Sequence, residues 1–330
     1  MFEDAVDNLS RVGYTHDEAA FLCLAATHSG YFVRRQFNDF LRQPRGGAAA
    51  RFIEKLIAKG HAQVVHFRLN RLIYHIRTLK VYARLDQADN RNRREKAPLT
   101  IKRKLMCLDF VLAHRERHFL RSEAEKLAYF TESRHVPIEH LPVRRYEPKG
   151  FGKATLRYFV DKLPVYVSGD AAAPVVHFAY VDEGAESLGG FETFLDQYHH
   201  LFASLGAFEV VYVVTDSLWA QRAQRIFNRR YAGDVPARED ADSEQARMLR
   251  FFEMRRKWEA RDFTGFSTEK VIEYREEKRR FAGAEWDERY RRWLSEGVPV
   301  TRIEGHAAMT IRAFLLPHDY ELFGSLRHAC

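Results

Sequence analysis

Three cationic side chains recur at helical spacing near the N-terminus. Arg51, Lys55 and Lys59 stand four residues apart within 48–59, so a helix over this stretch carries them on one face. The apolar residues of the same stretch make the opposite face: Phe52, Ile53, Leu56 and Ile57. Guanidinium and ammonium groups on an exposed helix face contact phosphate oxygens and base edges. The chemistry indicated is recognition of a polyanion.

A second group of polar and basic residues follows that helix. Gly60 ends it, and two β-rich stretches, 63–67 and 72–76, flank a short polar tip. We expect a hairpin whose tip residues grip the nucleic-acid backbone or enter its minor groove: Arg68, Asn70 and Arg71.

Two helices precede the cationic one. Thr15 and Glu18 form a capping-box pattern ahead of the apolar run 19–26. A second helix is predicted from Tyr31 to about Leu41, with Arg34 and Arg35 on its polar side. Gly46 to Ala50 are small residues that would let a helix start approach DNA closely, and Arg45 lies beside them. We therefore add Arg34, Arg35 and Arg45 to the candidate DNA contacts.

The order helix, helix, helix, basic hairpin is that of a winged helix-turn-helix. At RFIEKLIAKGHAQVV followed by RLIYHI, the chain resembles the winged-helix pattern of MarR-like regulators. The resemblance implies that 48–59 is a recognition helix for the major groove and that the hairpin is the wing. The alternative is a three-helix packing or protein-docking module with a solvated basic face.

Charge is distributed unevenly along the chain. Residues 1–160 contain 30 basic and 17 acidic residues, a net charge of +13, whereas 161–330 carry −5. A basic half favours double-stranded DNA as partner. The tract 89–96 lacks apolar residues, so we expect an exposed arm whose Arg91, Arg93 and Arg94 contact phosphates, or else a solvated linker.

An α/β pattern occupies the middle of the chain. Strands are predicted over 155–167, 174–182 and 208–214, with helices over 189–206 and 216–230. The cues PVYV, HFAYVDEG, FETFLDQYHHLF and EVVYVVTD resemble the core of PD-(D/E)xK nuclease-like domains. A winged helix followed by such a core also resembles the replication-relaxation family of plasmid and mobile-element proteins.

The nuclease resemblance raises a catalytic alternative. Such sites hold Mg²⁺ on two carboxylates beside a lysine, and Asp182 and Glu183, with Asp161 as a partner, are the candidates. Gly184 stands where the lysine is expected. The sequence therefore favours an inactive scaffold, no cofactor and a non-enzymatic protein, with a Mg²⁺-dependent nuclease as the alternative.

The last hundred residues predict charged helices with aromatic faces over 244–260 and 267–282 and around Trp286 to Leu294. These faces either cover the α/β core or form a dimer. A final strand is predicted over 309–316, available to the central sheet.

Together these observations predict an α+β protein. Its expected parts are a winged helix-turn-helix (1–85), a basic helical connector (86–150), an α/β nuclease-like domain (151–235) and a helical region with a final strand (236–330). The start, MFEDAVDNLS, resembles no secretory signal, no apolar run is long enough to cross a membrane, and three cysteines make no disulfide framework. We expect a bacterial, cytoplasmic, nucleoid-associated homodimer that regulates transcription, replication or transfer of a mobile element such as a plasmid.

Overall fold

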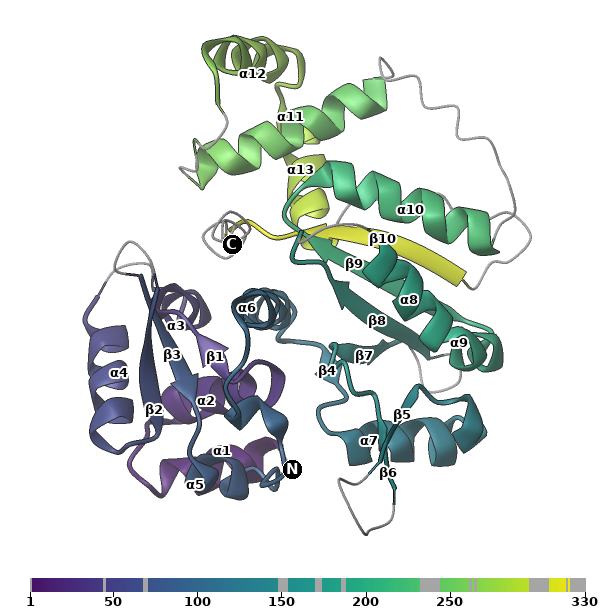
Figure 1. The fold of residues 1–330 in the computed structure, drawn as a ribbon. Helices are drawn as coiled ribbons and strands as arrows, with labels where there is room; N and C mark the ends of the chain where they lie inside the picture. Colours follow the sequence, from purple (N-terminus) through teal and green to yellow (C-terminus); the bar gives the residue numbers. More distant parts are fainter. Residues whose placement is uncertain are drawn as a thin grey trace, which may run out of the picture.

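The structure is a computed structural model of the full chain (Figure 1). The residues it describes are 2–43, 46–67, 71–147, 154–169, 174–184, 188–231, 244–260, 263, 266–296, 309–318 and 320. They form a mixed α+β structure with several sheets. Among them, none of the helices combines the length and apolar character that a membrane crossing requires.

The first part of the chain, here called the N-terminal unit, contains five helices and a small sheet among its described residues. Its elements are α1 (Phe2–Ser10), α2 (His16–His28), β1 (Tyr31–Phe32), α3 (Arg34–Phe40), α4 (Ala48–Ala58), β2 (Ala62–Phe67), β3 (Arg71–Ile76) and α5 (Leu79–Arg84). The strand order is β1-β3-β2, and both pairings are antiparallel. The predicted hairpin is therefore confirmed as β2 and β3, with His66 opposite Leu72.

Helix α2 is the centre of this unit. The predicted capping box is confirmed: the Thr15 amide donates to the Glu18 carboxylate at 2.8 Å, and the Glu18 amide donates to the Thr15 hydroxyl at 3.3 Å. The helix is buried nearly all round, and Phe21 contacts Phe37 and Phe52 at ring-centroid distances of 5.0 and 5.8 Å. Aromatic packing thus fixes α3 and α4 against α2.

The helix predicted from Tyr31 begins three residues later, at Arg34. Tyr31 and Phe32 instead form β1, in which Tyr31 is opposite His75 and stacks on its ring at 4.1 Å. Two residues are too few for a strand pattern to be visible in sequence, so the pairing with β3 decided their conformation.

The central sheet has the strand order β10-β9-β8-β7-β4. Strands β4 (His118–Phe119), β7 (Val165–Ser168) and β8 (Val175–Val181) pair antiparallel, whereas β9 (Phe208–Val214) and β10 (Met309–Leu315) continue parallel to β8. Helices α8 (Gly189–Gln197) and α9 (His199–Leu205) join β8 to β9, and α10 (Ser217–Tyr231) follows β9. The prediction that 309–316 joins this sheet is confirmed.

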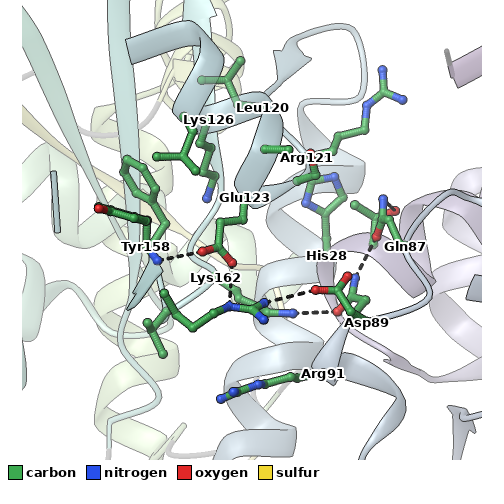
Figure 2. A pocket seen from close by; sticks show the side chains of 18 of the residues that line it. His28, Gln87, Asp89, Arg91, Leu120, Arg121, Glu123, Lys126, Tyr158 and Lys162 are labelled. Atoms are coloured by element: carbon green, nitrogen blue, oxygen red, sulfur yellow. Dashed lines mark hydrogen bonds and ion pairs between the residues drawn. The ribbon is translucent and has the colours of Figure 1, made fainter. Parts of the chain in front are cut away.

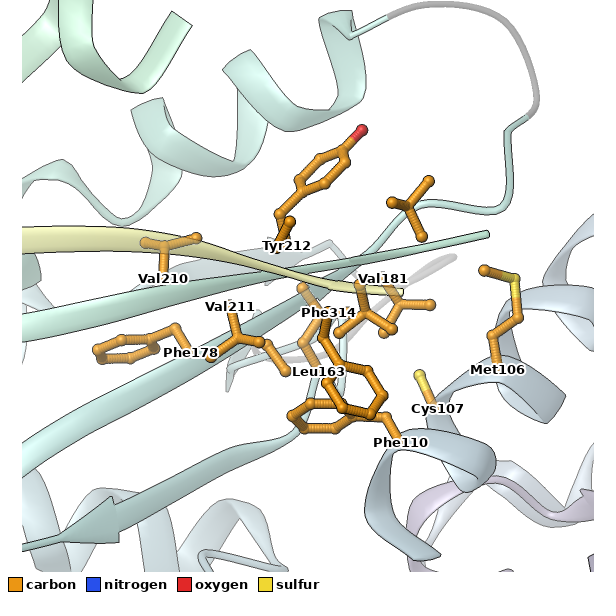
Figure 3. Close-up of a cluster of buried hydrophobic side chains, with 14 of the residues drawn as sticks. Met106, Cys107, Phe110, Leu163, Phe178, Val181, Val210, Val211, Tyr212 and Phe314 are labelled. Atoms are coloured by element: carbon orange, nitrogen blue, oxygen red, sulfur yellow. The ribbon is translucent and has the colours of Figure 1, made fainter. Parts of the chain in front are cut away.

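Helix α6 (Pro98–Ala113) lies between the N-terminal unit and the sheet (Figure 1). Met106, Cys107 and Phe110 point at the sheet, where Phe110 meets Phe314 at 5.3 Å (Figure 3). Leu108, on another side of the same helix, belongs to the core of the N-terminal unit. One helix therefore contributes to both hydrophobic cores.

A network of hydrogen-bonded polar side chains runs across the central sheet from strand to strand. The Ser168 hydroxyl of β7 is hydrogen-bonded to His177 Nε2 at 2.6 Å, and His177 Nδ1 lies 2.7 Å from the Glu209 carboxylate. Arg312 of β10 donates to Glu209 at 2.8 Å and to the Tyr166 hydroxyl at 2.6 Å. Burial opposes the charge of Glu209, but His177 and Arg312 outweigh it and lower its pKa. These bonds tie four neighbouring strands together.

The single strand predicted over 155–167 is wrong. Residues 155–158 form β6 (Thr155–Tyr158), which pairs with β5 (Val143–Tyr146) in a separate two-stranded sheet, and only 165–168 enter the central sheet. The break falls at Phe159 and Lys162, whose φ angles of 49° and 54° are left-handed and end strand geometry. Short helical turns precede this hairpin in the chain: α7 (Glu123–Ala128), a π-helical turn (Tyr129–Ser133) and η4 (Ile138–His140).

The C-terminal helices pack through aromatic rings. They are α11 (Glu244–Glu259), α12 (Thr268–Arg280) and α13 (Ala284–Glu296). Phe251 contacts Tyr274 at 5.9 Å, and Phe252 contacts Trp293 at 5.7 Å. These rings belong to the same hydrophobic cluster as the sheet, so the aromatic faces cover the α/β core.

Candidate nucleic-acid interface

Helix α4 presents its polar side to solvent at the outer edge of the N-terminal unit (Figure 1). Phe52, Ile53 and Leu56 are buried, as their spacing predicted. Ala49, expected at the DNA-facing start of the helix, is buried with them, whereas Ile57, expected on the same apolar face, is exposed. Arg51 and Lys59 are exposed, and Ile57 keeps 43% of its surface exposed between them. The helix thus has one apolar side that holds it and one side free to meet a partner.

Further exposed cations stand at the two ends of α3. Arg34 is exposed at the start of α3, and Arg42 is exposed just after that helix. Arg42 was not among the predicted contacts, although its position after α3 and before α4 was a usable signal. Arg51 Nη1 folds back over Gly47, at 2.9 Å from where a β-carbon there would stand, so the glycine makes room for it.

Lys55 is held on the body of the unit. Its ammonium lies 2.6 Å from the Glu18 carboxylate, which also caps α2, and 5.8 Å from the Tyr14 ring centre. With the side chain 30% exposed, Lys55 is a partly neutralised charge at the edge of the α4 surface. Arg51 and Lys59 are the more exposed cations of this helix.

Arg35 differs most from the expectation. Its guanidinium donates to both oxygens of Asp109 at 2.9 and 3.0 Å, to Asp39 at 2.7 Å and to the Tyr320 hydroxyl at 2.7 Å. Asp109 belongs to α6 and is buried. A paired guanidinium in this position fastens α3 to α6, so Arg35 is a structural residue rather than a DNA contact.

The field around the end of α4 is positive. His61 follows the helix, and Tyr14 Oη lies 2.7 Å from its Nδ1. Burial, with the nearby charges of Lys59, Lys80 and Arg84, lowers the pKa of His61. The imidazole therefore stays neutral among cations that favour an anionic partner.

Strand β3 runs up to the hairpin tip. The backbone of Arg71 pairs with Phe67, while Arg68 and Asn70, like Arg45 before α4, lie outside the described residues. Leu72, the next residue of β3, is 41% exposed. The described part of the hairpin therefore leads toward the predicted contacts at 68–71.

The basic tract 89–96 is not an exposed arm. It contains η2 (Arg91–Arg93), and the buried Asn92 side chain donates to the carbonyls of Ala26 and Thr27 at 3.1 and 2.8 Å. Arg91 lies 4.9 Å over the ring of Tyr146. Tyr146 belongs to β5, which in Figure 1 is separated from α4 by the rest of the N-terminal unit. The structure therefore does not bring Arg91, Arg93 and Arg94 onto the α4 surface.

The candidate carboxylates face tyrosines. Asp182 is buried and accepts from the hydroxyl of Tyr212, and Asp161 accepts from the hydroxyl of Tyr198 at 2.8 Å. Burial, with Asp182, Glu183 and Asp161, raises the pKa of Tyr180, so the three carboxylates share one neighbourhood. Among the described residues, no group of three His, Cys, Asp or Glu side chains is arranged to hold a metal ion.

Comparisons with known proteins give no assignment. No family model matches the chain, and neither the curated proteins nor the solved structures contain a significant match. The function is therefore argued from the arrangement of the side chains.

Proposed function

We propose that the N-terminal unit is a winged helix-turn-helix that binds double-stranded DNA, with α4 in the major groove and the β2–β3 hairpin as the wing. The observation that carries the proposal is the exposed polar side of α4, with Arg51 and Lys59, next to an antiparallel hairpin. A helix on this scaffold fits a groove about 12 Å wide. Arg34 and Arg42 at the ends of α3 extend the cationic surface to the flanking phosphates.

We further propose that the protein is a sequence-specific regulator of transcription, replication or transfer in a bacterial mobile element. The central region supports this: β7 and β8, helices α8 and α9, strand β9 and helix α10 follow one another in the order strand, strand, helix, strand, helix, the layout in which the sequence resembles a nuclease-like core. Tyrosine-bound carboxylates on that core favour a scaffold that positions the DNA-binding unit. Two copies acting on paired half-sites would raise the affinity.

The experiment is selection of bound duplexes from a random pool, followed by affinity measurements on the selected sequence. Arg51→Gln should weaken binding about tenfold or more, because one lost base or phosphate contact costs roughly 1–3 kcal/mol. Lys55→Gln should weaken it less, because Glu18 already neutralises much of that charge.

The matched control is Arg279→Gln, the same change on an exposed arginine of α12. It should leave the affinity unchanged. Wild-type affinity in the Arg51→Gln variant, or an equal loss in the control, would count against α4 as the DNA-reading helix.

A further inference from the structure

A cavity with several charged residues in its lining lies where the N-terminal unit meets the β5–β6 hairpin and α7 (Figure 2). Its volume is about 430 Å³, within the range of small-molecule sites. One wall comes from the end of α2 and from residues 86–91, and the other from 120–127 and 157–163. A ligand here would therefore touch both parts of the molecule.

Cations outnumber acids in the lining. The basic residues are Arg91, Arg121, Lys126, Arg157 and Lys162, and the acids are Asp86, Asp89 and Glu123. Arg157 is paired with two of those acids, at 2.9 Å from Glu123 and 3.3 Å from Asp89, so its single charge balances one of them. Glu123 is also held by the amide of Tyr158 at 2.7 Å.

The lysines of the cavity bond to neutral oxygens. Lys162 Nζ donates to Asn90 Oδ1 at 2.6 Å, and Lys126 Nζ donates to the Leu163 carbonyl at 2.9 Å. The acids near Lys126 are Asp161, Glu125 and Glu123, and Asp161 itself accepts from the hydroxyl of Tyr198. Positive charge at the cavity thus exceeds what the described acids supply.

One imidazole at the cavity lacks a partner. His28 is 6% exposed, and its Nε2 is buried without a hydrogen bond among the described residues. Burial, together with Lys126 and Arg121, lowers the pKa of His28 to about 3, so the ring is neutral at physiological pH. A buried polar atom left unpaired is costly, and a bound acceptor would satisfy it.

We propose that this cavity binds a small multivalent anion carrying phosphate or carboxylate groups, which bridges the N-terminal unit and the β5–β6 region. The left-handed backbone of Phe159 and Lys162 in the lining is consistent with a turn kept for a ligand. This proposal does not depend on DNA binding. If the protein failed to bind DNA but bound the anion, the inference drawn here would still hold.

The affinity should depend on pH in a defined direction. Burial lowers the pKa of Lys162 to about 7, and the charged groups that face it are Lys104, Arg157, Asp89 and Lys96. A bound anion favours the protonated ammonium and raises that pKa, so binding takes up a proton near neutral pH. Affinity should therefore fall as the pH rises from 6 to 9.

The test is calorimetric titration of the full chain with pyrophosphate and, separately, with citrate, which distinguishes phosphate from carboxylate ligands. We expect either anion to bind. We also expect the enthalpy of binding to change with the ionisation enthalpy of the buffer in the direction that indicates proton uptake by the complex. Lys162→Met should weaken binding about tenfold or more, the loss of one charge-assisted hydrogen bond. Lys270→Met, the same change on exposed α12, should have no effect.

His28→Phe keeps a ring of similar size, and serves if the lysine variant fails to fold. It should weaken anion binding several-fold without lowering the melting temperature of the free protein, because it removes an unpaired buried nitrogen. Absence of binding by both anions to the wild type, or wild-type affinity in the Lys162 and His28 variants, would overturn the proposal.

Discussion

Arg35 shows how a single charged residue acquires a role that its neighbours in sequence do not reveal. Its arginine–arginine context on a short polar helix suggested a phosphate ligand. Its partner Asp109 lies 74 residues away, and Gln36 donates to the same carboxylate at 2.8 Å. Composition predicts where charge gathers, but not which charge a distant acid neutralises.

The Asp109 carboxylate should therefore matter for stability. Asp109→Asn leaves the Arg35 guanidinium without its buried counter-charge, and we expect the free energy of unfolding to drop by about 2–3 kcal/mol, below the full cost of a completely buried pair because Arg35 is 29% exposed. Urea denaturation at neutral pH measures the change.

Asp39→Asn is the internal control, because Asp39 binds the same guanidinium but is 46% exposed. Its loss should cost less than about 0.5 kcal/mol. If the two variants were equally stable, the buried ion pair would not be what fastens α3 to α6.

At the scale of elements, the sequence predicted best where periodicity was strong. Helix α4 was expected over 48–59 and spans Ala48–Ala58, and the apolar strand 208–214 is β9. The prediction of an exposed arm over 89–96 was wrong because the conformation of this tract depends on Asn92. The hydrogen bonds from the Asn92 side chain to α2 cannot be predicted from the hydropathy of the sequence. Long-range polar contacts of this kind decide conformation without any local signal.

The contact between α2 and η2 gives a backbone prediction. Gly30 has φ +84°, and a β-carbon there would stand 2.5 Å from the carbonyl oxygen of Asn92. Gly30→Ala should lower the free energy of unfolding by about 3 kcal/mol, because left-handed strain and a backbone clash add. Thermal or urea unfolding measures it.

Gly206→Ala separates the two causes, since Gly206 has φ +67° and no described atom within 4 Å of the added methyl group. It should cost about 1 kcal/mol, the strain alone. An equal loss in the two variants would show that η2 does not press on Gly30.

At the scale of the whole molecule, α6 is what makes the parts one structure. Lys102, Lys104 and Asp109 on this helix are buried, although charged residues are usually found at the surface. The N-terminal unit packs on one side of this helix and the central sheet on the other, and these two parts are far apart in the sequence. The mixed fold was therefore predictable from local patterns, whereas the burial of α6 and the cavity beside η2 depended on tertiary packing.

Helix α4 and the hairpin are proposed to form one cationic surface for duplex DNA, and the salt dependence of binding tests this directly. For the wild type, the logarithm of the affinity should fall linearly with the logarithm of salt concentration, and Arg51→Gln should reduce the slope by about one. Lack of duplex binding at low salt, or the same slope in the variant and the wild type, would contradict it.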